Sequence, residues 1–296
     1  MEALQEKVAE YIAELKQQSV SDNTVVSYER DLKQLADYFA AQGSTCWRFV
    51  SKPQLEAYLR QMEKDKKRPA TRSRAIASMK AFFRYLEQSG EIERSPAGQI
   101  KSPKIEKEVP HILTPEETVQ LLMQPDGKTA KSMRDRAMLE LLYATGIRVS
   151  ELLQLEVEDV NLTMDYILCR HGGRERVVPF GHAAKKSLQE YLNTARPALV
   201  KEADSRQLFT NLSGRKMSRQ GFWKLIKQYA QAAGIQGEIT PHTLRHSFAA
   251  HLVNNGADLY AVQEMMGYAD LSAAQIYAKM RHASVREVYK KAHPRE

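Results

Sequence analysis

Three short segments in the second half of the chain hold side chains that can bind an anion, transfer a proton or act as a nucleophile. The first, residues 144–153, reads ATGIRVSELL and places Arg148 at the start of a helix, two residues after the glycine that ends the preceding one. The second, residues 240–246, reads TPHTLRH, with a threonine that can cap a helix and a proline suited to its first turn. His242 and Arg245 therefore lie on one face, near a positively polarised helix end.

The third segment, residues 266–277, reads MGYADLSAAQIY and ends on Tyr277. Each segment alone has an ordinary structural interpretation, because a lone arginine commonly pairs with a carboxylate and a helical tyrosine commonly packs in a core. His242 and His246 have the spacing of a zinc-binding helix, but Thr243 stands where a metalloprotease needs glutamate, so we expect no metal. The sequence has no Walker loop, dinucleotide fingerprint or G-x-S-x-G elbow. Taken together and in this order, the three segments are far more specific than any one of them.

The elements that position these segments are predicted to form two domains, since 296 residues are too many for one small core. The first hundred residues read as helical throughout, with apolar periodicity from Tyr28 to Phe39 and further helices near 52–64 and 70–88. Repeated prolines between Ser95 and Pro110 lack an apolar period and predict an extended linker. We therefore place the boundary at about residue 108, between domains 1–108 and 109–296.

The second domain is predicted to be helical apart from one small β-hairpin. Residues 166–170 and 176–180 are rich in strand-forming side chains, and Gly172 and Gly173 between them predict the turn. Periodicity and capping residues predict helices over 115–123, 131–145, 148–155, 182–195, 218–232, 241–255, 258–266 and 271–279. The expected fold class is mainly α, with a small β-sheet or hairpin in the C-terminal domain.

The net charge of +8 favours a polyanionic partner such as nucleic acid or an anionic membrane surface. Residues 64–84 hold eight Lys or Arg and one acid, and a second basic helix follows Arg215. Each could alone be a solvated helix face, but one in each domain indicates a clamp round a DNA duplex. The candidate DNA-binding residues are Arg68, Arg72, Arg74, Lys80, Lys216, Arg219, Gln220 and Lys224.

The sequence carries no secretory signal and no run of the roughly 18 apolar residues that a membrane span needs. Its two cysteines, Cys46 and Cys169, form no metal pattern and imply no disulfide framework. We therefore expect a cytoplasmic protein without a membrane partner.

On these residues the chain resembles the tyrosine recombinase (phage integrase) family, and most closely its Xer-type site-specific recombinases. The resemblance covers nearly the whole chain: NTVVSY and DL at residues 23–28 and 31–32, the linker, the three segments, and a closing VYKKAHP at residues 288–294. It implies an N-terminal SAM-like helical bundle that binds a core DNA site, followed by a tyrosine-recombinase catalytic domain.

The family pattern of Arg, Lys, His-x-x-Arg, His or Trp, and Tyr matches this chain at four positions and departs from it at two. The hairpin reads RHGGRER at residues 170–176, so His171 occupies the position of the family's lysine, and Tyr268 replaces the second histidine. The candidate catalytic residues are therefore Tyr277, Arg148, His242, Arg245, His171 and Tyr268.

In the mechanism that the resemblance implies, Tyr277 attacks a DNA phosphate and forms a 3′-phosphotyrosine. A free 5′-hydroxyl later reverses that bond without ATP, metal or another cofactor. Arg148 and Arg245 suit the non-bridging oxygens of the phosphate. His242 is the candidate base or hydrogen-bond partner of the tyrosine.

The leaving 5′-oxygen needs a proton, and His171 is the candidate donor because a histidine titrates near neutral pH. Two alternatives stay open: a shifted hairpin brings Arg170 or Arg174 to the site, or the acid step is impaired. Tyr268 can still offer a hydroxyl to the phosphate or pack against the site.

The resemblance implies double-stranded DNA as the partner and a homo- or hetero-tetramer on two DNA sites. Xer enzymes often work with a paralogous recombinase and a septal DNA translocase, and resolve chromosome or plasmid dimers. The short architecture favours this role over the integrase of a mobile element. The other interpretation is a catalytically impaired DNA-binding relative, which only the changes at His171 and Tyr268 support.

Overall fold

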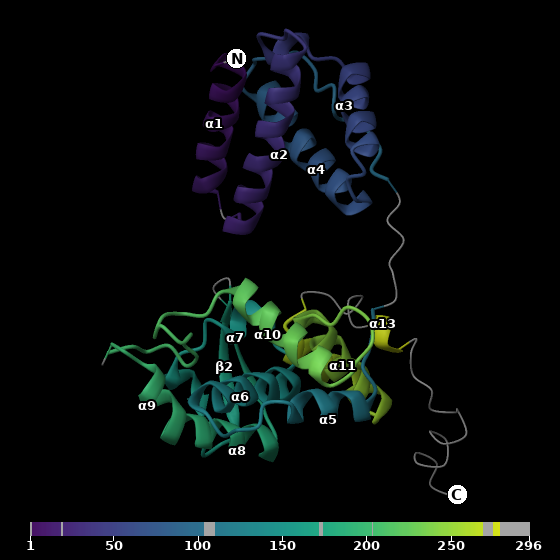
Figure 1. The fold of residues 1–296 in the computed structure, drawn as a ribbon. Helices are drawn as coiled ribbons and strands as arrows, with labels where there is room; N and C mark the ends of the chain where they lie inside the picture. The colour runs from purple at the N-terminus through teal and green to yellow at the C-terminus, as the bar shows by residue number, and fades with distance from the viewer. Residues whose placement is uncertain are drawn as a thin grey trace, which may run out of the picture. The chain divides into compact units, whose positions relative to one another are not determined.

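The computed structural model describes residues 2–18, 20–103, 110–171, 174–202, 204–268 and 275–278. The chain divides into two compact units, residues 1–108 and 109–296 (Figure 1). Each unit contains an apolar core of its own. Among the described helices, none combines the length and the apolar character that crossing a bilayer requires.

The N-terminal unit packs its helices around one core rich in aromatic side chains. The helices are α1 (Glu2–Gln17), α2 (Asp22–Ala41), α3 (Lys52–Lys64) and α4 (Pro69–Gln88), with a short 3-10 turn, η1 (Trp47–Phe49). The turn is held by Trp47, whose indole nitrogen donates to the carbonyl of Leu4 at 3.1 Å and whose ring centre lies 5.0 Å from that of Phe82. This side chain therefore joins α1 to α4 across the core.

The C-terminal unit is built around α6 (Ala130–Thr145), which lies in the middle of that unit in Figure 1. It packs against α5 (Pro115–Met123), α8 (His182–Glu190) and α11 (Pro241–Asn254). Leucines and other apolar side chains are buried on all its sides, as a helix at the centre of a domain requires. The other helices are α7 (Val149–Leu152), α9 (Arg196–Leu199), α10 (Arg219–Ala232), α12 (Leu259–Met266) and α13 (Gln275–Ala278).

A small antiparallel sheet lies in the same unit, in the order β1 (Val160–Asn161), β2 (Tyr166–His171) and β3 (Arg174–Pro179). Alternation along β3 buries Val178, which pairs with the buried Ile167 of β2, and turns Arg176 toward the same face. The predicted hairpin is confirmed, and so is the fold class: mainly helical, with a small sheet in the C-terminal part.

Two helices differ from the ranges that the sequence predicted. The helix expected over 148–155 is shorter in the structure, where α7 has 4 residues. The residues that follow α7 pair instead with the segment around Leu208, whose amide donates to the carbonyl of Leu155 at 2.9 Å. The helix expected over 182–195 continues through a π-helical turn at Tyr191–Ala195 into α9. Pro197 has no N–H to donate back along the helix, which accounts for the widened turn before it.

The turn between α6 and α7 depends on Gly146. This residue ends α6 in a left-handed conformation, with φ of +59°. A Cβ on it would lie 2.1 Å from the ring of Phe248 on α11. The close approach of the two helices therefore requires a glycine for both its conformation and its size.

We expect Gly146→Ala to lower the free energy of unfolding of the C-terminal unit by about 2–4 kcal/mol, the sum of left-handed strain and overpacking. Urea unfolding measures the loss. Gly234→Ala is the matched control, since Gly234 has φ of +69° and nothing within 4 Å of its added Cβ; it should lose only about 1 kcal/mol from strain. Equal losses would show that the Phe248 contact contributes nothing.

Candidate active site

The start of α11 is fixed by the threonine and proline that precede the histidine of the motif. The amide of Thr243 donates to Oγ1 of Thr240 at 3.3 Å, and the amide of Thr240 donates back to Oγ1 of Thr243 at 3.1 Å. The first two turns then carry three side chains of chemical interest, His242, Arg245 and His246.

Three arginines converge on the C-terminal end of α12. The carbonyls of residues 265, 266 and 267 accept, in that order, from Arg176 at 3.0 Å, Arg245 at 2.5 Å and Arg148 at 2.9 Å. The last carbonyls of a helix lack partners inside it and form the negative end of its dipole, so they suit guanidinium groups. Gly267 ends the helix with φ of +61°, and a Cβ there would lie 2.8 Å from the guanidinium of Arg176.

Glu151 compensates the charge of this cluster from the other side. Its carboxylate, on a residue that is 2% exposed, accepts two hydrogen bonds from Arg176 at 2.8 and 2.9 Å and one from the amide of Arg148 at 2.7 Å. Burial alone would raise the pKa of Glu151, but the hydrogen bonds from Arg176 and from that amide outweigh it and hold the pKa below its usual value. Glu151 is therefore ionised at neutral pH.

Arg245 is the most deeply placed of the predicted site residues that carry a charge. It is 4% exposed, donates to the carbonyl of Gly146, and lies with its guanidinium carbon 5.0 Å from the ring centre of Tyr268. Burial lowers its pKa, and the nearby charge of Arg148 adds to that. Both arginines keep further N–H donors for an oxyanion, because each guanidinium has five.

Tyr277, on α13, lies in the same region with its side chain fully buried. Its hydroxyl is 2.6 Å from Nδ1 of His246 and 3.1 Å from the hydroxyl of Tyr268. The predicted nucleophile and two of its predicted neighbours, Arg245 and Tyr268, are thus brought together in one chain. Tyr277 follows Arg245 by 32 residues in the sequence.

Both partners in the Tyr277–His246 contact are held neutral. Burial raises the pKa of Tyr277 above its usual value, as does the hydrogen bond with Tyr268, although the charge of Arg245 opposes the shift. Burial, together with His242 and Arg245, lowers the pKa of His246 to about 4. Tyr277 is therefore protonated in the protein alone, beside a neutral imidazole.

The histidine that contacts the Tyr277 hydroxyl in this structure is His246, and the assignment of His242 as base or hydrogen-bond partner stays a prediction. His242 lies one turn closer to the start of α11 and is exposed at the surface, with its ring centre 6.4 Å from that of His246. Partial burial and the charges of Arg245, Arg148 and Arg219 lower its pKa. These cations also mark the region near His242 as attractive to an anion.

The hairpin contributes His171 as the last residue of β2, paired with Arg174 across the turn. The side chains of both lie outside the described part of the structure. Arg170, which the sequence left as an alternative to His171, is committed elsewhere: its guanidinium contacts Asp159, and its Nε donates to Glu175 at 2.9 Å. These contacts favour His171 over Arg170 for the lysine position.

Two predicted DNA-binding residues of the N-terminal unit are engaged within the protein. Arg74 donates two hydrogen bonds of 2.8 Å to Asp31, which is 5% exposed, and this pair joins α4 to α2. Arg72 lies 2.6 Å from a carboxylate oxygen of Glu63 on α3. The structure therefore gives both arginines a role in helix packing. Arg68 is exposed and Lys80 half-buried.

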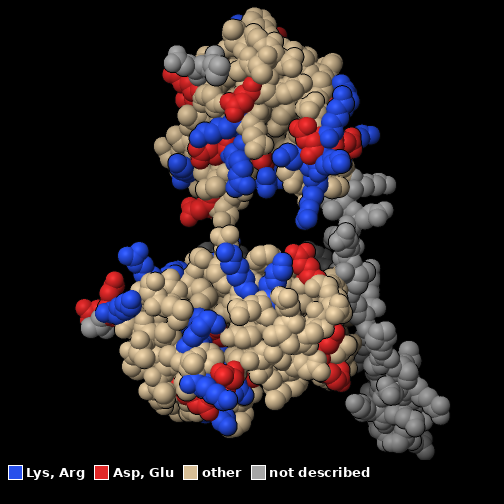
Figure 2. Space-filling model, in the orientation of Figure 1, with Lys and Arg blue, Asp and Glu red and all other residues tan. Residues whose placement is uncertain are grey.

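The basic residues predicted in the C-terminal unit are all at the surface. Ser218 caps α10, and exposed side chains precede and fill its first two turns: Lys216, Arg219, Gln220 and Lys224. Figure 2 shows Lys and Arg gathered in groups on both units, on a surface that is otherwise mostly uncharged. Arg219 is also close enough to His242 to lower its pKa, so this basic helix end adjoins the candidate site.

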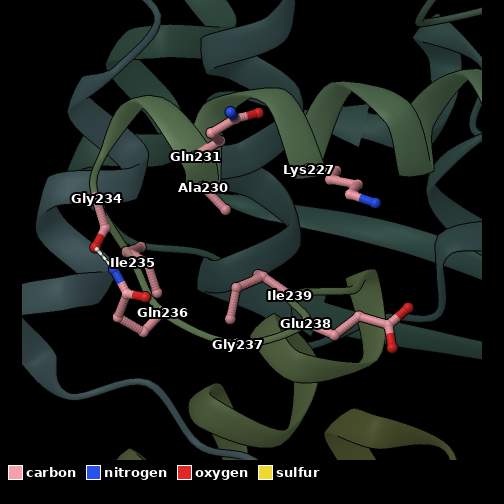
Figure 3. Close-up of a pocket in the computed structure, with 9 residues that line it drawn as sticks. All are labelled: Lys227, Ala230, Gln231, Gly234, Ile235, Gln236, Gly237, Glu238 and Ile239. Carbon is pink, nitrogen blue, oxygen red and sulfur yellow. Dashed lines mark hydrogen bonds between the residues drawn. The ribbon is translucent and has the colours of Figure 1, made fainter.

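A separate groove of about 440 Å³ lies at the other end of α10 (Figure 3). Lys227 and Glu238 are the charged residues among those that line it, and Gln236 donates to the carbonyl of Gly234 at 3.3 Å across its wall. The lining includes none of the predicted site residues. The groove is therefore separate from the candidate site around the end of α12.

Sequence reasoning missed three residues of the cluster, His246, Glu151 and Arg176. His246 was considered only as a metal ligand, although its i,i+4 spacing places it on the face of α11 that carries His242. Glu151 follows Arg148 by three residues at the start of α7. The two-residue alternation of β3 was the available signal for Arg176, since it shares a face with buried Val178.

We expect Glu151→Gln to lower the free energy of unfolding by about 2–3 kcal/mol at pH 7, because two arginines lose a buried anionic acceptor. Because the pKa of Glu151 is lower in the folded protein, its carboxylate stabilises the fold fully above about pH 4.3, the pKa of a glutamate in the unfolded chain. This stabilisation is lost as the pH falls through the pKa of Glu151 in the folded protein. The variant should therefore show a weaker decline in stability below pH 4.

Unfolding in urea at several pH values measures both effects. Glu175→Gln is the control, since its ion pair with Arg170 lies on the surface, with the Glu175 side chain 59% exposed, and should contribute less than about 1 kcal/mol. A Glu151→Gln variant as stable as this control would contradict a supporting role for the carboxylate.

Comparison with known proteins places this geometry in a family. The model described as "Phage integrase family" matches residues 111–283, and "Phage integrase, N-terminal SAM-like domain" matches residues 8–90. The tyrosine recombinase XerD of Oceanobacillus iheyensis is 42% identical over 282 residues, covering 94% of this chain and 95% of that protein. XerD of Staphylococcus epidermidis strain ATCC 12228 is 40% identical over 280 residues, with the same coverage.

Solved structures share the fold. The Tn1549 transposon integrase in complex with a circular intermediate DNA has a TM-score of 0.75 and 21% identity, covering 98% of each chain. The XerH site-specific recombinase bound to a palindromic difH substrate has a TM-score of 0.73 and 23% identity, covering 90% of this chain and 78% of that one. This chain therefore belongs to the phage integrase family, as an Xer-type tyrosine site-specific recombinase that cleaves and rejoins DNA.

Proposed function

We propose that this chain cuts a DNA strand by attack of its own Tyr277 on a backbone phosphorus held by Arg148 and Arg245. The observation that carries the assignment is the meeting of Tyr277, Tyr268 and Arg245 in one buried cluster: the two hydroxyls are 3.1 Å apart, and the guanidinium lies over the Tyr268 ring. Cleavage would then occur in cis, with nucleophile and cations from the same subunit.

The reaction depends above all on stabilisation of the negative charge that develops on the phosphate. As the Tyr277 oxygen bonds to phosphorus, negative charge grows on the two non-bridging oxygens, which the remaining N–H donors of Arg148 and Arg245 can bind. The bond from phosphorus to the 5′-oxygen breaks and that oxygen takes up a proton. A 3′-phosphotyrosine remains, and a 5′-hydroxyl from a partner strand reverses the step and restores Tyr277.

The remaining predicted residues take supporting parts. His242, exposed among Arg148, Arg245 and Arg219, is proposed to bind a phosphate oxygen. His171 is proposed to protonate the leaving 5′-oxygen, and the ion pairs of Arg170 support this choice over the neighbouring arginine. Tyr268 is proposed to hold Tyr277 through its hydroxyl.

The two units are proposed to bind one duplex as a clamp, with residues 1–108 on the core site and residues 109–296 carrying the catalytic site. Exposed Lys216, Arg219, Gln220 and Lys224 at the start of α10 support the contribution of the second unit. In the first unit, Arg72 and Arg74 are ion-paired. Arg68 and Lys80 form no ion pair with any of the described residues, so they suit the predicted DNA contacts better.

The XerD relatives, similar over 94% of this chain, support a role in resolving chromosome or plasmid dimers, as a homo- or hetero-tetramer on two DNA sites. A paralogous recombinase and a septal DNA translocase are the partners that this role would need. The fold shared with the Tn1549 transposon integrase supports a second candidate, the integrase of a mobile element. Mapping of binding sites on genomic DNA distinguishes the two, since a site outside any mobile element supports the first and sites at the ends of a mobile element support the second.

Tyr277→Phe should abolish the covalent protein–DNA adduct formed on a nicked suicide duplex and leave DNA binding unchanged, because only the hydroxyl oxygen is lost. Denaturing gel electrophoresis detects the adduct, and a mobility shift measures binding. Tyr260→Phe is the control, since Tyr260 is 67% exposed on α12 and should react normally. An adduct that persists in Tyr277→Phe would overturn the assignment.

His171→Ala should slow adduct formation on an all-oxygen duplex by about 10²–10⁴-fold, the usual contribution of a general acid. A duplex with sulfur in place of the leaving 5′-oxygen should react at nearly the rate of the unaltered protein, because a thiolate leaves without a proton. Arg170→Ala is the control and should show no sulfur rescue. A slow His171→Ala reaction on both duplexes would count against the acid role.

A further inference from the structure

Among the residues that the structure describes, His246 is the one titratable side chain that contacts the Tyr277 hydroxyl and has no part in the chemistry above. Its Nδ1 lies 2.6 Å from the Tyr277 hydroxyl, a short hydrogen bond between groups 31 residues apart in sequence. The two ring centres are 5.9 Å apart at 45°, so the contact is through the edge of the imidazole. The ring is half-buried on α11, directly after Arg245.

The proton arrangement follows from the two partners of Tyr277. The hydroxyl has one proton and lies between His246 on one side and the Tyr268 hydroxyl, at 3.1 Å, on the other. A neutral imidazole protonated on Nε2 presents a lone pair on Nδ1. Tyr268 can then donate to the Tyr277 oxygen while Tyr277 donates to His246, so that both hydroxyl protons of this hydrogen-bond series are used.

We propose, on the basis of the function assigned to Tyr277, that His246 is the base that accepts the Tyr277 proton during attack on the phosphate. As the tyrosine oxygen forms its bond to phosphorus, its proton moves to Nδ1 and the ring becomes an imidazolium. The bond from phosphorus to the 5′-oxygen breaks, and that oxygen receives a proton from a separate donor. In rejoining, the 5′-hydroxyl attacks phosphorus and gives its proton back to that separate donor, while Nδ1 returns its own proton to the departing tyrosine oxygen.

The surroundings of His246 suit a base that acts only with substrate bound. The charged or titratable groups near it in the described structure are Arg245 and His242 on its own helix and Tyr277 on α13, with Tyr268 beyond Tyr277. Burial and the two helix neighbours hold the pKa of His246 at about 4, so the ring is neutral and able to accept. The negative charge of a bound phosphate opposes the charge of Arg245 and raises the pKa of the His246 imidazole toward that of a useful base.

His246→Asn tests the role, because its amide hangs from Cγ as Nδ1 does and can keep a hydrogen bond to Tyr277 but cannot take a proton. Single-turnover adduct formation is measured from pH 6 to 9 on a nicked duplex with sulfur in place of the leaving 5′-oxygen, so that the titration of His171 does not shape the profile. The unaltered protein should show a nearly level rate across this range. The variant should be slower by about 10²–10⁴-fold at pH 7 and gain about tenfold per pH unit, since it now requires tyrosinate formed beforehand.

His251→Asn is the matched control on the same helix. Its nitrogens contact the Tyr143 hydroxyl at 2.9 Å and the Leu113 carbonyl at 2.9 Å, away from Tyr277. The change should lower stability and leave the pH profile level. His246→Gln provides a second variant if the asparagine protein unfolds, and DNA affinity is measured for each by mobility shift.

The outcomes separate this inference from the function on which it rests. Peptide mass spectrometry of the adduct from the unaltered protein identifies the attacking residue, and an adduct elsewhere than Tyr277 would overturn the function itself. An adduct on Tyr277 together with a His246→Asn profile that stays level, whether fast or slow, would overturn only the base role and leave His246 a positioning residue.

Discussion

The crowding of three guanidinium groups at the end of α12 is the constraint on which the rest of the site depends. Arg148, Arg176 and Arg245 would repel one another strongly in a partly buried space if nothing compensated them. Three successive helix carbonyls, with the negative end of the dipole, and the carboxylate of Glu151 supply that compensation. Since one carboxylate and about half a charge from the dipole cannot neutralise three cations, the cluster keeps an excess positive charge of about one and a half.

That excess positive charge is what an incoming phosphodiester meets. Because the carbonyls, Glu151 and the turn at Gly267 already hold the guanidiniums in place, little reorganisation is needed when the anion binds. The same anchoring links distant parts of the fold, since α7, β3, α11 and the end of α12 each contribute a partner. The close approach of α6 and α11 at Gly146 is a further condition, because the carbonyl of Gly146 accepts from Arg245.

Local signals in the sequence predicted many of the helices and the hairpin. The bounds of α5, α6 and α11 followed from caps and apolar period, and the hairpin from strand-forming residues around two glycines. Contacts between distant segments were not predictable in the same way: nothing local says that His246 rather than His242 meets Tyr277, 31 residues later, or that Arg74 pairs with Asp31, 43 residues earlier. For this reason the basic residues at 64–84 predicted more side chains available to DNA than the structure offers, because Arg72 and Arg74 form ion pairs between helices.

The pairing of a buried tyrosine with a neutral histidine also resolves an electrostatic difficulty. Releasing the Tyr277 proton to solvent would leave a buried anion, which burial opposes even beside Arg245. Moving it by one hydrogen bond to His246 creates two opposite charges in contact, whose mutual attraction is large where the dielectric is low. Arg245 then stabilises the tyrosinate, and a bound phosphate stabilises the imidazolium. Deprotonation is thereby favoured only while a phosphate occupies the site, so the nucleophile stays inert in the protein alone.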